Sequence, residues 1–364
     1  MDIFLDNAST TPLCEAAKQS IIKHLDTFGN PSSAHELGRQ SRVLIEDARE
    51  RIAKCINANP EYIYFTSGGS EANTLALNNR YHSASSKFEH HSVVANWPKI
   101  SITKDGFIKA HKLNNMLSES WDIPFDIMSC MYVNNEIGTI QPIKELSTIA
   151  HRYGILLHAD AVQAMPYIPI DVKDLGCDML SASGHKFGAP KGVGFLYANS
   201  RSRIKPIING GKQENSMRPG TENILGILAM VAALEDTVEH MEEHNQHVKS
   251  LRDNLLNRLL KIDGAHLNGS LENRIPGNIN IRFDGVSGAR LVSLCSLYGV
   301  YISSGSACSE GIPTPSHVLK AIGLSDEDAL SSVRITIGHQ NTEEEINIAA
   351  DIIKSLVDRV RSDS

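Results

Sequence analysis

The chain has 364 residues, of which 41% are hydrophobic and 21% are charged, and its formal net charge is -7. This balance is typical of a folded globular protein and argues against disorder. The negative charge gives no reason to expect a nucleic acid or a membrane surface as a partner. No apolar run reaches the roughly 18–20 residues that a membrane-spanning helix needs. The first residues lack the basic region of a secretory signal, so we expect a cytoplasmic protein.

The cysteines are scattered along the chain and include no CxxC pair. This spacing argues against a zinc or iron–sulfur cage built from this chain, and we expect no metal site. A disulfide framework is also not expected in a long chain without an export signal. The default interpretation of each cysteine is a small buried hydrophobic residue. The six are Cys14, Cys55, Cys130, Cys177, Cys295 and Cys308, and only Cys308 has a sequence context that departs from this interpretation.

Strand-like and helical segments alternate through the first part of the chain. Short apolar runs bounded by turn residues predict strands, and a period near 3.6 residues predicts helices. The expected strands are residues 61–66, 126–133, 155–160, 178–182 and 194–197, and the expected helices are residues 71–77 and 143–153. Alternation of this kind predicts an α/β fold, with a mostly parallel sheet that helices cover on both faces.

A long charged helix is expected over residues 224–261. Beyond it, strands at 277–283 and 334–337 mix with a helix at 343–361, which indicates a smaller α+β unit. A chain of this length usually exceeds one hydrophobic core. We therefore predict a large domain over residues 14–255 and a small domain formed by residues 1–13 and 256–364.

The richest local signal is Ser183-Gly184-His185-Lys186, which follows an expected strand. A buried lysine amine can form a Schiff base with an aldehyde cofactor. Pyridoxal phosphate is such a cofactor, and it also needs an anion site, a carboxylate at its ring nitrogen and a group stacked on its ring. A lone lysine near glycine is most often a solvated surface residue, so these further requirements decide the interpretation.

Residues 67–71 offer an anion site at a strand-to-helix turn. Glycines let the backbone approach a phosphate, and the start of a helix directs N–H groups toward it. Ser70, Ser183 and His185 could add side-chain donors. The alternative is an ordinary capped helix with an acidic residue in its first turn.

Asp160 ends an apolar strand and could hold the pyridine nitrogen protonated, because ligands bind at the carboxyl ends of parallel strands. Its alternative role is to cap the next helix. Gln163 and Asn135 could contact the phenolic oxygen of the ring. His90 could stack on the ring and move protons. The alternative is that His90 is a surface histidine. The sequence hardly distinguishes His90 from His91 as the stacking residue.

Cys308 lies in residues 303–315, where small and turn-forming residues predict a loop that can move. A thiolate on such a loop could attack a sulfur atom held on the cofactor. Without the cofactor motifs, an unreactive loop cysteine would be the preferred interpretation.

Taken together, these residues resemble the cysteine desulfurases of the class V aminotransferase-like family, in particular the long-loop, iron–sulfur-assembly type. The resemblance covers nearly the whole chain. The motifs that carry it are residues 5–12, 28–33, 66–73, 89–90, 133–138, 158–163, 183–186, 217–221, 304–308 and 332–334. It implies the type I fold of pyridoxal-phosphate-dependent transferases.

The resemblance also implies a role for each matching residue. Lys186 would hold the cofactor as a Schiff base and then move protons, and Cys308 would take the sulfur as a persulfide. Arg334 would clamp the substrate carboxylate, with Asn135 beside it. Thr221 matches a threonine that completes the phosphate site of the partner subunit, which implies a homodimer. The other implied cofactor contacts are His90, Asn135, Asp160 and Gln163 at the ring, and Gly69, Ser70, Ser183 and His185 at the phosphate.

The reaction implied is removal of sulfur from L-cysteine, which leaves L-alanine and a persulfide on Cys308. An acceptor protein would then take the sulfur for iron–sulfur cluster assembly, tRNA thiolation or DNA modification. One alternative is a selenocysteine lyase or desulfinase, whose reaction can proceed without the loop cysteine. Another is a catalytically idle subunit that acts as a sulfur-transfer platform, although such a platform would need neither Lys186 nor Asp160.

Overall fold

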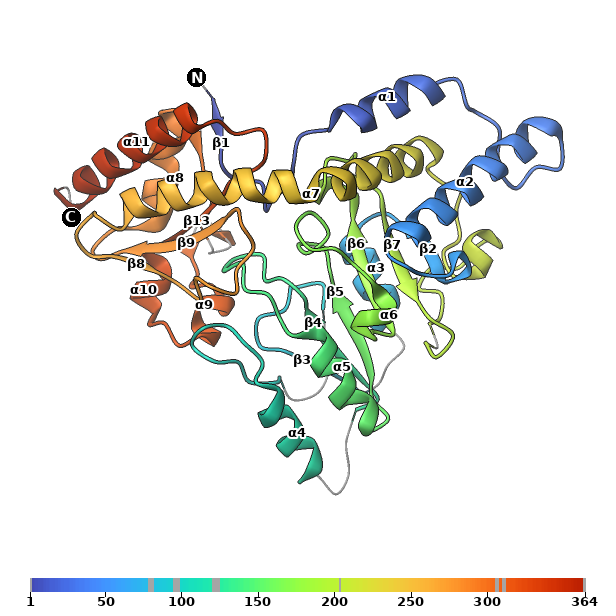
Figure 1. Cartoon of the computed structure of the whole chain (residues 1–364), viewed down its shortest axis with the longest axis horizontal. Helices are drawn as coiled ribbons and strands as arrows, with labels where there is room; N and C mark the ends of the chain where they lie inside the picture. Colours follow the sequence, from blue (N-terminus) through green and yellow to red (C-terminus); the bar gives the residue numbers. More distant parts are fainter. Residues whose placement is uncertain are drawn as a thin grey trace.

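The computed structural model describes residues 2–77, 82–93, 99–119, 125–202, 204–304 and 314–362, together with the backbone of residues 308–309 and 312–313. Figure 1 shows a central sheet, a smaller unit beside it that contains both ends of the chain, and a long helix that runs across the two. Within the described residues, no helix combines the length and the apolar character that crossing a bilayer requires.

The central sheet has the strand order β2-β7-β6-β5-β4-β3. Neighbouring strands from β3 to β6 run parallel, and β7 runs antiparallel to both β6 and β2. This confirms the predicted mostly parallel sheet. The strands are β2 (Ile63–Thr66), β3 (Ser83–Ser85), β4 (Ile127–Met131), β5 (Leu156–Asp160), β6 (Met179–Ser183) and β7 (Gly194–Ala198).

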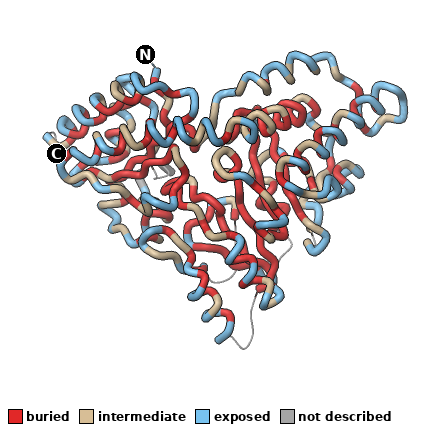
Figure 2. Tube along the Cα trace, in the orientation of Figure 1, coloured by how far each residue is buried: buried red, intermediate tan, exposed pale blue. Residues whose placement is uncertain are grey.

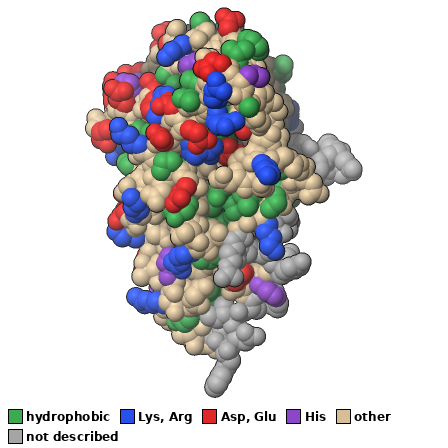
Figure 3. Space-filling view, turned by 90° about the vertical axis from the view of Figure 1, so that its right-hand side faces the viewer, with side chains coloured by type: hydrophobic (Ala, Val, Ile, Leu, Met, Phe, Trp, Pro, Cys, Tyr) green, Lys and Arg blue, Asp and Glu red, His purple; other side chains and the backbone are tan. Residues whose placement is uncertain are grey.

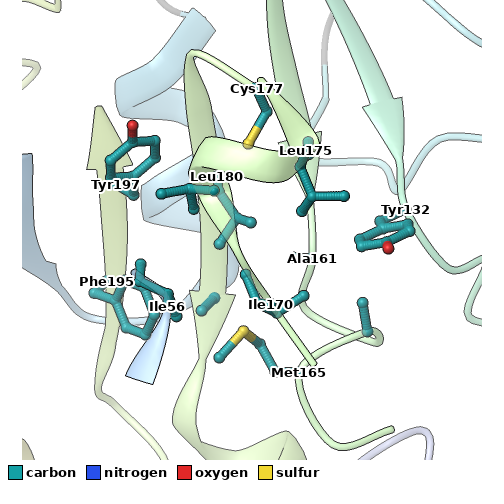
Figure 4. Packing of buried hydrophobic residues seen from close by; sticks show 14 of the residues in the cluster. Ile56, Tyr132, Ala161, Met165, Ile170, Leu175, Cys177, Leu180, Phe195 and Tyr197 are labelled. Carbon is teal, nitrogen blue, oxygen red and sulfur yellow. The ribbon is translucent and has the colours of Figure 1, made fainter. Parts of the chain in front are cut away.

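Helices cover this sheet because parallel strands need crossover connections, which are usually helical. Every residue of β4, β5, β6 and β7 is buried, as expected for strands covered on both faces. The helices of this part are α1 (Glu15–His24), α2 (Glu36–Cys55), α3 (Gly69–Leu77), α4 (Ala110–Ser118), α5 (Ile143–Arg152) and α6 (Val172–Leu175). Figure 4 shows part of the resulting core, where Leu180 and Phe195 of the sheet pack with Ile56, Met165 and Ile170.

A second core lies around the sheet β13-β9-β8 and the short parallel pair β1 and β10. Its strands are β1 (Ile3–Phe4), β8 (Ala265–Leu267), β9 (Asn278–Phe283), β10 (Val300–Tyr301) and β13 (Ser332–Thr336). Its helices are α8 (Gly288–Leu297) and α11 (Glu343–Ser362), whereas α9 (His317–Ala321) and α10 (Asp326–Leu330) pack in a separate small cluster with Phe88 and Met131. Ile3 and Leu5 belong to this core, so the start of the chain packs with its end.

Helix α7 (Ile224–Leu259) supplies buried residues to both cores: Leu234 packs in the first, whereas Val248 and Leu255 pack in the second. Buried residues accordingly line both of its ends in Figure 2. The boundary that we placed after residue 255 falls near the end of this helix and stays a prediction.

Most predicted elements agree with the structure to within a few residues, with two differences. The first half of the strand expected at 61–66 is a 3-10 turn (Pro60–Tyr62) that begins at a proline. In the expected loop at 303–315, the backbone of β11 (Cys308–Ser309) pairs antiparallel with β12 (Ile312–Pro313). Several elements were not predicted: helices α1, α2, α4, α6, α8, α9 and α10, and strands β1, β3, β8 and β10.

Candidate active site

A cavity of about 290 Å³ opens at the carboxyl ends of β4, β5 and β6 and at the start of α3. This is the edge at which ligands bind in open α/β sheets. Of the predicted site residues, Thr221 does not line it, and the side chain of Cys308 lies outside the described residues. The predicted residues that do line it are Gly69, Ser70, His90, Asn135, Asp160, Gln163, Ser183, His185, Lys186 and Arg334.

Lys186 ends the 3-10 turn Gly184–Lys186 that follows β6. Its Nζ donates hydrogen bonds to the backbone carbonyls of Ala8 (2.6 Å) and Ser9 (2.7 Å). Burial, and then the charge of Arg334, lower the pKa of Lys186 to about 8. An amine with this pKa is largely neutral at mildly alkaline pH, which is the state that attacks an aldehyde.

Asp160 ends β5 and is only 1% exposed. Its Oδ2 accepts a hydrogen bond from Asn73 Nδ2 (2.7 Å), and its Oδ1 accepts one from the backbone N–H of Val162 (3.1 Å). Burial raises the pKa of Asp160 despite these donors. A cation in the cavity would therefore stabilise the carboxylate, and a protonated pyridine nitrogen is such a cation.

The two adjacent histidines, His90 and His91, lie in different surroundings. His90 lines the cavity, and its Nδ1 lies 2.7 Å from Ser92 Oγ and 3.1 Å from the backbone nitrogen of Ser92. Burial lowers the pKa of His90, so this ring is neutral near pH 7. The His91 ring instead packs against His317 on α9, with 4.7 Å between the ring centroids.

The start of α3 has the features of an anion site. A Cβ atom at Gly69 would lie 2.7 Å from Val162 Cγ2, so a side chain here would collide with the wall of the cavity. Ser70 and Ser183 also line this part. His185 Nδ1 lies 3.2 Å from Thr10 Oγ1, and burial, with the charge of Lys186, lowers the pKa of His185 to about 4. A neutral imidazole still offers one N–H to a phosphate.

The opposite wall carries Arg334 on β13. Its Nη1 donates to the Asn135 carbonyl (3.1 Å), and its Nη2 pairs with Asp6 Oδ1 (2.8 Å). Its Nε is buried, with no hydrogen-bond partner among the described residues. Arg334 lines the cavity, so its positive charge can attract the carboxylate of an incoming ligand. Gln163, which also lines the cavity, is buried and donates to the Ala8 carbonyl (2.8 Å).

These residues fit pyridoxal phosphate on chemical grounds. The cavity combines a lysine with a lowered pKa, a buried carboxylate that forms no ion pair within the described residues, a neutral histidine and an anion site at a helix start. An arginine at its wall can attract the carboxylate of a substrate. This is the donor set that the cofactor requires.

Two further polar residues at the site, Asn73 and Asp6, were not predicted to have a role. Asn73 follows Ser70 by three residues, so both lie on one face of α3. That spacing was a usable signal. Asp6 meets Arg334 only because the start of the chain packs against β13, at the bridge between Asp6 and Thr336. No local pattern predicts that contact.

The side chain of Cys308 lies outside the described residues, but both roots of its loop are placed. Ser303 exchanges backbone hydrogen bonds with Arg334, at 3.0 and 2.6 Å. Ser316 Oγ donates to Glu136 Oε2 (2.5 Å), next to Asn135. The loop therefore starts and ends beside the wall of the cavity.

Thr221 lies outside the cavity of its own chain. It is exposed, in the connection between the 3-10 turn Gln213–Ser216 and α7. Its position leaves the hydroxyl available to another molecule.

Comparison with protein families and curated proteins gives a consistent result. The family model described as "Aminotransferase class-V" matches residues 3–348. Cysteine desulfurase IscS of Dictyoglomus turgidum is 40% identical, over 99% of this chain and 96% of that protein. Cysteine desulfurase IscS of Methanosarcina thermophila is 38% identical, over 99% of this chain and 93% of that protein.

Solved structures resemble the chain over a similar extent. The NifS-like protein from Rickettsia africae has a TM-score of 0.92 and 32% identity, over 98% of this chain and 100% of that chain. SspA, solved in complex with cysteine, has a TM-score of 0.79 and 30% identity, over 94% of this chain and 100% of that chain.

Proposed function

We propose that this chain, which belongs to the class-V aminotransferase family and is a cysteine desulfurase that uses pyridoxal phosphate, transfers the sulfur of L-cysteine to Cys308. The described cavity is the proposed site of this reaction. One observation carries the assignment of residues. A single cavity brings together Lys186 with a lowered pKa, the buried Asp160 and the guanidinium-bearing Arg334.

When bound, pyridoxal phosphate supplies an aldehyde for amines and an electron-poor ring that stabilises negative charge on the attached carbon. In our proposal Lys186 would hold the cofactor and would move protons at the substrate. Asp160 would keep the ring nitrogen protonated, and His90 would cover the ring. Asn135 and Gln163 would contact the hydroxyl side of the ring. Gly69, Ser70, Ser183 and His185 would bind the phosphate.

Arg334 binds the carboxylate of cysteine at the wall of the cavity. The Cys308 thiolate then attacks the substrate sulfur. A sulfur–sulfur bond forms, the Cβ–S bond breaks, and its electron pair stays with the substrate, which takes up a proton at that carbon and leaves as alanine. The roots of the Cys308 loop support this step because both lie beside Arg334 and Asn135.

A homodimer completes the proposal, with Thr221 reaching the phosphate site of the partner. Its support is an apolar surface on α1, α2 and their flanks, which we call the α1–α2 surface. It comprises Leu13, Ile22, Leu25, Phe28, Leu37 and Val43, all exposed. Figure 1 places these helices at the end of the molecule away from both termini, and Figure 3 shows hydrophobic side chains among charged ones on that side. Exposed apolar clusters of this kind are typical of protein interfaces.

The persulfide would pass to an acceptor protein in iron–sulfur cluster assembly or in the thiolation of tRNA or DNA. We propose a cytoplasmic location, supported by the free thiols of Cys14, Cys55, Cys130, Cys177 and Cys295. Reducing compartments keep such thiols unpaired.

Mass spectrometry of the Cys308 peptide tests the sulfur route. After brief incubation of the holoenzyme with L-cysteine, we expect this peptide to gain one sulfur atom for each alanine formed. Full alanine production with an unmodified Cys308 would instead support a lyase that does not need the thiol.

A further inference from the structure

A line of polar contacts runs from Asp160 to the His90 ring. Asn73 is only 1% exposed, and its Nδ2 donates to Asp160 Oδ2 (2.7 Å) and to Ser92 Oγ (2.9 Å). Ser92 Oγ in turn lies 2.7 Å from His90 Nδ1, and the backbone N–H of Ser92 donates to the same nitrogen at 3.1 Å. The connection joins the carboxylate proposed at the ring nitrogen to the histidine proposed on the ring face.

The direction of each hydrogen bond follows from the chemistry of the groups. Asn73 must present its amino group to Asp160. In the opposite orientation the Asn73 carbonyl oxygen and the Asp160 carboxylate would both be acceptors, and no hydrogen bond could form. Ser92 Oγ accepts from Asn73, so its own hydrogen is free to point at His90. A backbone N–H can only donate, and therefore His90 Nδ1 must accept. The proton of the neutral ring is then on Nε2.

We propose that Ser92 is a positioning residue that keeps His90 neutral, with its proton on Nε2, and that links this ring to Asp160 through Asn73. The proposal rests on the proposed function, because it gives His90 and Asp160 their places at the cofactor. A doubly protonated ring would direct its Nδ1–H against the backbone N–H of Ser92. The contact therefore disfavours the imidazolium form.

The other titratable groups that face His90 come from four places in the fold. Asp160 on β5 favours the charged ring, whereas His91 and Lys186 disfavour it. His317 on α9 also interacts with it. None of these groups distinguishes Nδ1 from Nε2 by a hydrogen bond, and among the described residues only Ser92 does so.

Nitrogen NMR of histidine-labelled holoenzyme tests the proposal directly, with a His90→Asn variant to assign the signals. We expect the wild-type His90 to carry its proton on Nε2 and to lack one on Nδ1. In Ser92→Ala the hydroxyl donor is lost and the backbone donor remains, so His90 should take up a proton at a pH higher by roughly 0.5–1 unit. Ser92→Thr retains the hydroxyl and should restore the wild-type titration.

Kinetics give a second readout. In Ser92→Ala the acid limb of the pH profile of kcat should shift to higher pH by the same roughly 0.5–1 unit. The KM for cysteine should change little, because Arg334 is untouched. Ser293→Ala is the matched control, since within the described part of the chain this exposed serine on α8 bonds only its own helix, at the Ala289 carbonyl. It should behave as wild type.

Two results would overturn the proposal. One is a wild-type His90 with its proton on Nδ1, a measurement that needs no variant to fold. The other is a Ser92→Ala protein in which His90 titrates at the wild-type pH. If no variant and no wild-type protein released alanine, the proposed function would fail instead, and the NMR result would still stand.

Discussion

Lys186 lies between opposing charges, and this balance determines when its amine is reactive. Burial and Arg334 lower its pKa, whereas Asp6 and Asp160 raise it, with a result of about 8. Below that pH the amine takes up a proton and no longer attacks an aldehyde. Arg334 is itself paired with Asp6, so the residue that we assign to the substrate carboxylate also affects the lysine.

Replacement of Arg334 by glutamine should therefore have two effects. Loss of its charge should move the pH at which Lys186 binds the cofactor to above about 8. Loss of a charged hydrogen bond should raise KM for cysteine by roughly 10-fold to 100-fold. Absorption of the reconstituted cofactor against pH, and steady-state alanine release, measure the two effects. The exposed Arg359→Gln on α11 is the control, and equal behaviour of the two variants would contradict the assignment.

Lys186 and Lys191 form a natural pair for comparison, because they are close in sequence and only Lys191 is exposed. Loss of a proton-transferring group typically costs about 10²–10⁴ in rate. Lys186→Ala should lose alanine release by at least this factor and should not retain the Schiff-base absorption. Lys191→Ala should keep both. A colourless Lys191→Ala protein, or an active Lys186→Ala protein, would remove Lys186 from its proposed role.

Among the elements of the fold, strands were the most predictable from sequence. Short apolar runs such as β4 and β5 stand out because both of their faces are buried. Helix α2 was missed although its buried residues Ile45, Ala48 and Ile52 follow a helical period, while exposed apolar residues such as Val43 lie on its other side. Contacts between distant segments, such as Ser303 with Arg334, depend on strand pairing that no local pattern encodes.

The site was predictable where a motif lies at the end of a strand, as with Asp160 and Lys186. It was not predictable where one side chain only connects two others. Asn73 and Ser92 are such connectors, and their importance follows from distances of 2.7–2.9 Å across separate elements.

The segment before His90 is held by a buried acid, Glu89, which is 6% exposed. Glu89 Oε1 accepts hydrogen bonds from the Met131 N–H (2.9 Å) and from the Ser86 hydroxyl. Burial raises the pKa of Glu89 to about 8. The folded chain therefore keeps a proton that the unfolded chain releases above about pH 4.3.

This linkage predicts that the free energy of unfolding falls as pH rises from about 4.3 to 8, by an amount on the order of a few kcal/mol from Glu89. Glu89→Gln keeps an acceptor for Met131 and cannot ionise, so this part of the pH dependence should disappear. Urea unfolding across that pH interval measures the effect. An identical slope in both proteins would show that Glu89 titrates normally.

For the whole molecule, the cavity depends on parts of the chain that are far apart in sequence. Ala8 and Ser9 near the start, the strands of the central sheet and Arg334 near the end all meet there. If Thr221 of a partner completes the phosphate site, as we propose, activity also depends on association of two chains.

The α1–α2 surface provides the test of association. Phe28 and Leu297 are both 80% exposed, but only Phe28 lies on this surface. Phe28→Glu should place a charge in the interface, shift the protein toward monomers and weaken cofactor binding. Leu297→Glu on α8 should remain a dimer. Analytical ultracentrifugation distinguishes these outcomes, and a wild-type monomer with full cofactor affinity would exclude the proposed dimer.

The central claim is that sulfur leaves cysteine through the thiol of Cys308. Its most direct test is the rate of alanine release from L-cysteine by a Cys308→Ser variant that still binds the cofactor, with Cys55→Ser on α2 as the matched control. We predict that Cys308→Ser keeps the cofactor absorption of the wild type and loses nearly all alanine release, whereas Cys55→Ser keeps both. Alanine release by Cys308→Ser at the wild-type rate would contradict this account.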